Sequence, residues 1–95
     1  MNAEAIVSRL QELGFDASVS HTGGGCFTIF VGEPNAEGYY PTAVGPFYLR
    51  DGEYVSDEGD CYVGPDDSDD PNGDYIKVDL IADAVAMVEA RNMLV

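Results

Sequence analysis

Residues 47–56 read FYLRDGEYVS, and this stretch decides the fold class. Two runs rich in aromatic and β-branched residues, a composition typical of strands, flank the dipeptide Asp51-Gly52. Asp-Gly is strongly favoured in the two-residue type I′ turn of a β-hairpin. The stretch therefore predicts two antiparallel strands joined by a tight turn, and further strands must pair with them to form a sheet.

A second hairpin is predicted upstream of this one. Residues 15–20 (FDASVS) alternate between apolar and polar side chains, which is the period of a half-buried strand. Residues 26–31 (CFTIFV) have the composition of another strand, and residues 21–25 (HTGGG) indicate the turn between the two. Residues 33–42 contain two prolines, a glycine and paired tyrosines, and predict a loop.

Helices are predicted at both ends of the chain. Asn2 is a favourable N-cap and Gly14 a favourable glycine beyond the C-cap, so they bound a first helix. A second helix is predicted from a cap at Asp79 to about Asn92. Apolar residues recur at helical spacing in both segments, at Ile6, Leu10 and Leu13 in the first and at Ile81, Ala84, Val85 and Val88 in the second.

This order of elements predicts an α+β fold. We expect the 95 residues to form a single domain, a two-layer sandwich in which both terminal helices pack on one face of an antiparallel sheet of three to four strands. Residues 57–74 are predicted to be an acidic loop, with residues 61–63 (CYV) as a short edge strand within it.

No segment suggests export or a membrane. The N-terminal residues lack the apolar core of a signal peptide, and no apolar run approaches the roughly 20 residues that a membrane span needs. We therefore expect a cytoplasmic protein.

The negative charge is concentrated in one part of the chain. Residues 51–74 hold ten of the 18 acidic residues and neither Lys nor Arg, in a chain whose net charge is −14. Such a field repels nucleic acid and anionic membranes, and it favours basic proteins or divalent cations. We therefore expect no direct contact with nucleic acid or a membrane.

The interpretation that we favour for this segment is a docking surface for a basic partner, such as a nucleic-acid-binding protein. A dense array of carboxylates can occupy a groove that otherwise holds phosphates, and tyrosines among the acids match an interface with an aromatic centre and a polar rim. The alternatives are cross-strand packing for the tyrosines and a solvated loop for the acids. The predicted partner-binding residues are Tyr54, Asp57, Glu58, Asp60, Tyr62, Asp66, Asp67, Asp69 and Asp70.

A calcium- or magnesium-binding module is the alternative function. Residues 68–79 partly match an EF-hand loop, because acidic or amide residues and a glycine fall at several of its ligand and turn positions. Ser68 replaces the first Asp, however, Pro71 intrudes, and residues 63–65 (VGP) prevent a preceding helix. Asp70, Asn72 and Asp79 fall at ligand positions of the EF-hand match, whereas a weaker carboxylate site would lie among Asp66, Asp67, Asp69, Asp70 and Asp74.

No catalytic or cofactor motif stands out, so we expect a protein without enzymatic activity or cofactor. His21 and Cys26 flank the glycine turn and form the minimum pair for thiol catalysis, but the negative field works against a thiolate. A zinc site from these two residues and Cys61 would lack a fourth soft ligand. Cys26 and Cys61 are instead expected to be reduced.

Several features together resemble a known class of protein. These are the capped N-terminal helix, residues 13–32 (LGFDASVSHTGGGCFTIFVG), the acidic middle and residues 81–90 (IADAVAMVEA). The pattern is similar to that of small acidic single-domain proteins encoded by bacteriophages and mobile elements of actinobacteria, most of which have no assigned function. The resemblance implies a phage protein in the host cytoplasm that binds a host protein or imitates DNA to block a restriction or CRISPR nuclease. Separately, we expect a monomer or a homodimer.

Overall fold

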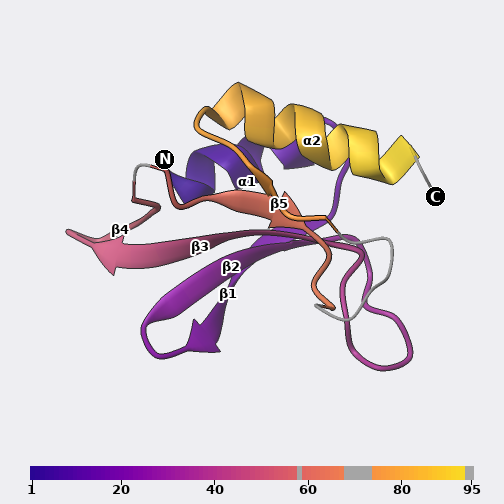
Figure 1. The fold of residues 1–95 in the computed structure, drawn as a ribbon, viewed down its shortest axis with the longest axis horizontal. Helices are drawn as coiled ribbons and strands as arrows, with labels where there is room; N and C mark the ends of the chain where they lie inside the picture. The colour runs from indigo at the N-terminus through magenta and orange to yellow at the C-terminus, as the bar shows by residue number, and fades with distance from the viewer. Residues whose placement is uncertain (58, 68–73, 94–95) are drawn as a thin grey trace.

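The computed structural model describes residues 1–57, 59–67 and 74–93 of the chain (Figure 1). Two helices enclose a run of six strands in sequence order. The elements are α1 (Ala3–Glu12), β1 (Ala17–Gly23), β2 (Cys26–Val31), β3 (Thr42–Arg50), β4 (Glu53–Val55), β5 (Tyr62–Gly64), β6 (Ile76–Lys77) and α2 (Ile81–Met93).

All six strands belong to one antiparallel sheet with the order β1-β2-β3-β5-β6, and β4 also pairs with β3. The centre of the sheet is β3, which pairs with β2 along one side. On its other side, the first part of β3 pairs with β5 and its last part pairs with β4. The α+β class and the antiparallel sheet are confirmed, but the expected three to four strands are too few.

The two predicted hairpins form, with different limits. Both residues of the second turn have positive φ, 52° at Asp51 and 81° at Gly52, as a type I′ turn requires. The expectation that residues 21–25 form the first turn is wrong at its start, because β1 continues through His21 to Gly23. The second hairpin also begins earlier than expected, since β3 starts at Thr42.

The acidic segment contributes more sheet than the sequence predicts. The short strand expected at residues 61–63 is present as β5, but it is not at the edge, because it pairs with β3 on one side and β6 on the other. The prediction of a strand in this segment is therefore confirmed, and only its predicted place at the edge of the sheet is wrong. The two residues of β6, Ile76 and Lys77, are too short to leave a periodic signal.

The first helix ends as predicted at both termini. The side chain of Asn2 accepts a hydrogen bond from the Ala5 N–H at 3.1 Å, as an N-cap does. At the other end Gly14 has φ of 92°, its N–H donates to the Gln11 carbonyl, and the Phe15 N–H donates to the Leu10 carbonyl. This is the Schellman pattern, in which a glycine with positive φ satisfies the last carbonyls of a helix.

The N-cap of the second helix lies one residue later than predicted. The Leu80 carbonyl accepts the hydrogen bond from Ala84 N–H at 3.0 Å and so occupies the N-cap position, with Asp79 just outside the helix. Ala84, Val85 and Val88 are buried as predicted, and Ile81 packs partly buried against them.

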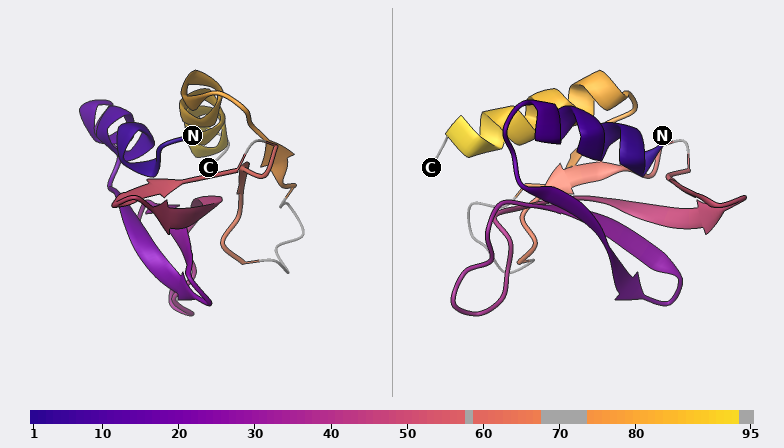
Figure 2. Two further views of the ribbon diagram at one scale, coloured as in Figure 1. Left: turned by 90° about the vertical axis from the view of Figure 1, so that its left-hand side faces the viewer. Right: turned by 180° about the vertical axis from the view of Figure 1, so that it is seen from behind.

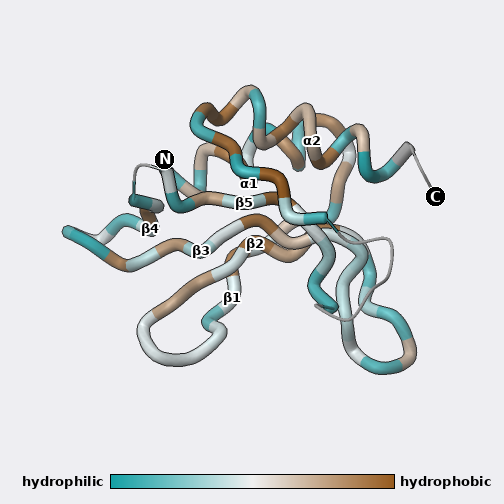
Figure 3. Tube along the Cα trace, viewed as in Figure 1, coloured by the Kyte–Doolittle hydropathy of each residue, from teal (hydrophilic) through white to brown (hydrophobic). Residues whose placement is uncertain are grey.

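Both helices lie on the same side of the sheet (Figures 1 and 2). Hydrophobic residues gather along the helices and the middle strands, and the tip of the β3–β4 hairpin is hydrophilic (Figure 3). The largest fully buried side chains come from α1, β2, β3, β5 and α2, and they include Ile6, Leu10, Ile29, Val44, Phe47, Val63 and Val88. The opposite face of the sheet carries no helix in the described part of the chain.

Neither helix, within the residues described, combines the length and the apolar character needed to cross a bilayer.

Replacing Asn2 by Ala should lower the free energy of unfolding by about 1 kcal/mol, because the Ala5 N–H loses its acceptor. Chemical denaturation followed by circular dichroism measures the change. Asn2→Asp, which keeps an accepting oxygen and adds a charge favourable at a helix N-terminus, should be close to wild type. Equal destabilisation by the two substitutions would contradict the capping role.

Candidate partner-binding groove

The helix-free face of the sheet has a row of small residues at its centre. The strand register places Phe30 opposite Ala43 and Ala43 opposite Gly64, and it places Gly45 opposite Tyr62. These residues alternate with the buried Ile29, Val44 and Val63, so their side chains face away from the helices. Because Ala43, Gly45 and Gly64 have little or no side chain, the surface is hollow between the larger residues around them.

Aromatic rings and prolines form the walls of this hollow. It has a volume of about 260 Å³, and its lining includes Phe30, Tyr62, Tyr75, Pro46, Pro65 and Asp66. The Tyr75 ring lies directly over Gly64, where a Cβ atom would be 2.4 Å from the ring. A side chain at position 64 would therefore displace Tyr75.

A second hollow adjoins the first at Pro65. It measures about 200 Å³, and the residues that line it include Glu33, Tyr39, Tyr40, Pro65 and Asp67. We call the two together the aromatic–acidic groove, defined by Phe30, Glu33, Tyr39, Tyr40, Tyr62, Asp66, Asp67 and Tyr75.

Two contacts of Tyr40 join parts of the groove that are distant in sequence. The Tyr40 N–H donates to Asp66 Oδ2 at 2.9 Å, which ties the loop before β3 to the acidic segment after β5. The Tyr40 ring also stacks on Phe30, with the ring centroids 4.7 Å apart and the planes at 21°. These contacts hold Tyr40 and Asp66 in place, so part of the groove is preformed.

The groove presents aromatic surface and negative charge to solvent. Tyr39, Tyr62 and Tyr75 keep 40%, 37% and 51% of their surface exposed, and Glu33 is also exposed. Among the described residues that line the two hollows there is no Lys, Arg or His. Lys77 is the cross-strand neighbour of Tyr62 but lines a different cavity, near Met1.

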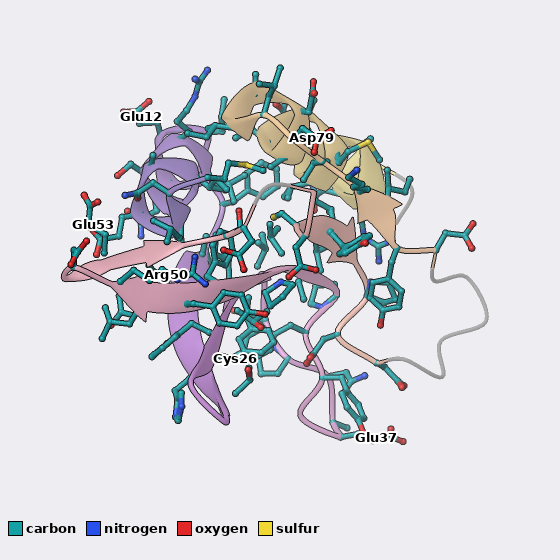
Figure 4. The ribbon with its side chains drawn as sticks, turned by 60° about the vertical axis from the view of Figure 1, so that its left-hand side comes forward. Glu12, Cys26, Glu37, Arg50, Glu53 and Asp79 are labelled. Carbon is teal, nitrogen blue, oxygen red and sulfur yellow. The ribbon has the colours of Figure 1, made fainter. Side chains whose placement is uncertain are left out.

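Two of the predicted acidic residues are engaged elsewhere. Asp57 forms an ion pair with Arg50, and this carboxylate raises the pKa of the guanidinium. Asp60 accepts a 3.5 Å hydrogen bond from the Tyr48 hydroxyl; burial and the charge of Asp60 raise the pKa of Tyr48. Figure 4 shows that Arg50 and Glu53 lie on the β3–β4 hairpin, well away from Glu37 in the loop that contributes Tyr39 and Tyr40.

The structure thus divides the predicted partner-binding residues. Tyr62, Asp66 and Asp67 lie in the groove, whereas Asp57 and Asp60 lie beside the β3–β4 hairpin. Tyr54 is half-buried and packs on Phe27 with ring centroids 4.6 Å apart, which fits the cross-strand alternative. Three further predicted residues, Glu58, Asp69 and Asp70, lie outside the described residues.

The predicted metal ligands do not come together in the described part of the chain. Asp66 lies in the groove, Asp79 lines the cavity of about 510 Å³ beside Met1, and Asp74 is exposed. Asp70 and Asn72 lie outside the described residues. Within residues 1–57, 59–67 and 74–93, no three His, Cys, Asp or Glu side chains are grouped closely enough to hold a metal ion.

His21 and Cys26, the residues considered for thiol chemistry, contact neighbouring strand residues. The His21 ring lies 5.0 Å from the Phe27 ring, and Cys26 is partly buried opposite Tyr48. Both cysteines are free thiols. Cys61 is buried, and burial raises the pKa of its thiol from 9.0 to about 11 despite a hydrogen bond with Ser56 that acts in the opposite direction.

Sequence reasoning predicted three of the eight residues that define the groove and missed the other five. Tyr39-Tyr40 stand between two prolines in a predicted loop, so they left a signal, whereas Phe30 left none because residues 26–31 (CFTIFV) are apolar on both faces apart from one threonine. Glu33 and Tyr75 left none, because their place depends on how two distant loops meet.

Comparison with protein-family models, with curated proteins and with solved structures finds no match to this chain.

We expect thiol reagents to modify Cys26 readily and Cys61 only when the protein opens. The thiolate is the reactive species, and Cys61 is both buried and, with its raised pKa, protonated at neutral pH. The measurement is the labelling rate of Cys26→Ser, whose single thiol is Cys61, with and without denaturant. Equally fast labelling in both conditions would show that Cys61 is accessible in the folded protein.

The raised pKa of the Cys61 thiol also predicts a loss of stability at alkaline pH. A folded-state pKa above the unfolded value stabilises the protein fully below about pH 9, and this contribution is lost as the pH rises through about 11. Unfolding of wild type and Cys61→Ala should therefore be compared across this range. The wild type should lose more stability than the variant, and parallel curves would contradict the assignment.

Proposed function

We propose that this protein is a non-enzymatic binding protein that holds a basic segment of a partner protein in the aromatic–acidic groove. The observation that carries the proposal is the composition of the groove: exposed tyrosines and three acidic residues, with no basic side chain among its described lining residues.

Electrostatics favours a cationic ligand. The net charge of −14 attracts basic molecules from a distance, and it accelerates their encounter with the protein. Within the groove, Glu33 comes from the loop before β3 and Asp66 from the segment after β5, so negative charge lies on both walls. A basic segment lying between them would be attracted from both sides.

The rings favour arginine or lysine side chains in particular. A guanidinium or ammonium group over an aromatic face gains about 0.5–2 kcal/mol, and the gain is larger where water is partly excluded. Tyr62 and Tyr75 flank the first hollow and offer exposed ring surface for such a contact. Tyrosine is also among the residues most enriched at interface hot spots.

The size of the hollows favours side chains of a peptide over a free small molecule. Pockets for drug-sized ligands have volumes of about 300–1,000 Å³ and enclose most of the ligand. The two hollows, of about 260 and 200 Å³, are smaller and lie side by side. They suit two neighbouring side chains of one extended segment.

This proposal differs from imitation of DNA. A DNA mimic needs a regular array of free carboxylates, whereas Asp57 is neutralised by Arg50 and Asp66 is tied to the Tyr40 backbone. A groove lined by tyrosines matches a basic peptide better than a surface shaped for phosphates. Capture of a nucleic-acid-binding protein that is competed by DNA but not by a basic peptide would favour mimicry instead.

The binding test uses a fluorescent peptide rich in arginine and a matched peptide with citrulline in its place, followed by anisotropy. The arginine peptide should bind more tightly, and its affinity should fall steeply between about 0.05 M and about 0.5 M NaCl. Tyr62→Ala should weaken binding about tenfold, while Tyr62→Phe, which keeps the ring, should not.

The control for charge compares two substitutions that each remove one negative charge. Glu33→Gln removes a carboxylate from the groove and should weaken binding, whereas Glu89→Gln removes one from the exposed surface of α2 and should not. An affinity that does not change with salt, or equal effects of the two substitutions, would exclude the groove as the binding site.

A further inference from the structure

The free edge of the sheet at β1 offers unpaired backbone groups. The Gly32 N–H donates to the Asp16 carbonyl at 2.8 Å, so these two opposed residues form a hydrogen-bonded pair, and every second pair along β1 and β2 is hydrogen-bonded in the same way. Residues 18 and 20 are then the next hydrogen-bonded positions, and the N–H and C=O groups of Ala17, Val19 and His21 point away from β2. Gln11 Nε2 donates to the Ala17 carbonyl at 3.1 Å, but no described residue bonds the outward groups of Val19 and His21.

This edge lacks the charged residues and prolines that commonly protect an edge strand, and its register with β2 shifts only near the turn, between His21 and Gly23. Residues 17–32, which span β1 and β2, contain no Asp, Glu, Lys, Arg or Pro, and they form the longest run without formal charge in the chain. Natural sheets commonly protect such edges with charges, prolines or a covering element. Figure 3 shows most of the β1–β2 hairpin in pale colours, in contrast to the hydrophilic tip of the β3–β4 hairpin.

We propose that two copies of this protein associate through antiparallel pairing of their β1 edges, with Ser20 opposite Ser20 on the two-fold axis. In this register Val19 of each copy pairs with His21 of the other, and each such pair exchanges two hydrogen bonds. All the outward groups of Val19 and His21 are then satisfied, and the Ala17 carbonyl keeps its bond from Gln11.

The charge distribution favours a second copy of this protein, and not a basic partner, as the molecule that pairs with the β1 edge. A two-fold contact places the same surface of each copy against itself, so any charged surface would face its own charge. With a net charge of −14, the neutral hairpin is where two copies can meet with the least repulsion. A basic partner, in contrast, is drawn to the acidic parts of the protein and gains nothing from an uncharged edge.

The shape of the molecule leaves room for this contact. The far half of the β1–β2 hairpin projects away from both helices (Figures 1 and 2). Pairing there forms one continuous sheet across the dimer, with the helices of both copies on one side and both aromatic–acidic grooves on the other. The inference does not depend on the proposed function, because the backbone pairing needs no ligand, although Thr22 near the end of β1 also lines the first hollow.

Sedimentation of the whole protein tests the association. The wild type should form a dimer in a concentration-dependent way, and His21→Pro should weaken it at least tenfold, because proline removes an outward N–H without breaking the β1–β2 ladder. His21→Ala, which keeps the N–H, should dimerise like the wild type. A monomeric wild type, or a dimer that His21→Pro leaves unchanged, would overturn the proposal.

Cross-linking tests the register, and it decides the question even if the proline variant fails to fold. In a Cys26→Ser background, Ser20→Cys should form an intermolecular disulfide on oxidation, because directly opposed residues at a non-hydrogen-bonded position have Cα atoms about 4.5 Å apart. Ser18→Cys should not, since the two copies of residue 18 would lie about 13 Å apart. Equal cross-linking at both positions would contradict this register, as would cross-linking at position 18 alone or at neither position.

Discussion

The pairing of β3 with three other strands is the constraint on which the rest of the structure depends. One side of β3 is filled by β2, and the other is shared by β5 and β4, one after the other along its length. Val44 and Phe47 of β3 are fully buried beneath the helices, so the same strand also anchors the core. The chain after β4 must therefore return along β3, which brings the acidic segment back over the sheet.

This return path explains why the groove forms where it does. Once β5 pairs with the first part of β3, Asp66 emerges next to the loop that leads into β3, and it accepts the hydrogen bond from Tyr40. The small residues Ala43 and Gly45 then line the hollow with aromatic side chains around them, and the neighbouring Gly64 lies beneath the Tyr75 ring. The hollow is a consequence of strand register, and the charge on its walls is a consequence of where the acidic segment crosses.

The sequence predicted the features that depend on local rules. The Asn2 cap, the Gly14 termination and the Asp51-Gly52 turn each rest on a few adjacent residues, and all three are present. The α+β class followed from them. The place of β5 inside the sheet and the existence of β6 did not follow, because short strands carry little periodicity and acquire their position from distant partners.

The candidate site was predicted less well for the same physical reason. Charge density marked residues 51–74 as a whole, but density alone does not distinguish an acid bound by Arg50 from one beside a tyrosine. Asp66 and Tyr40 are 26 residues apart in the chain, and no local pattern links them. Composition therefore indicates the sign of the charge that the protein carries, while the sheet register determines which of its many carboxylates stand next to exposed rings.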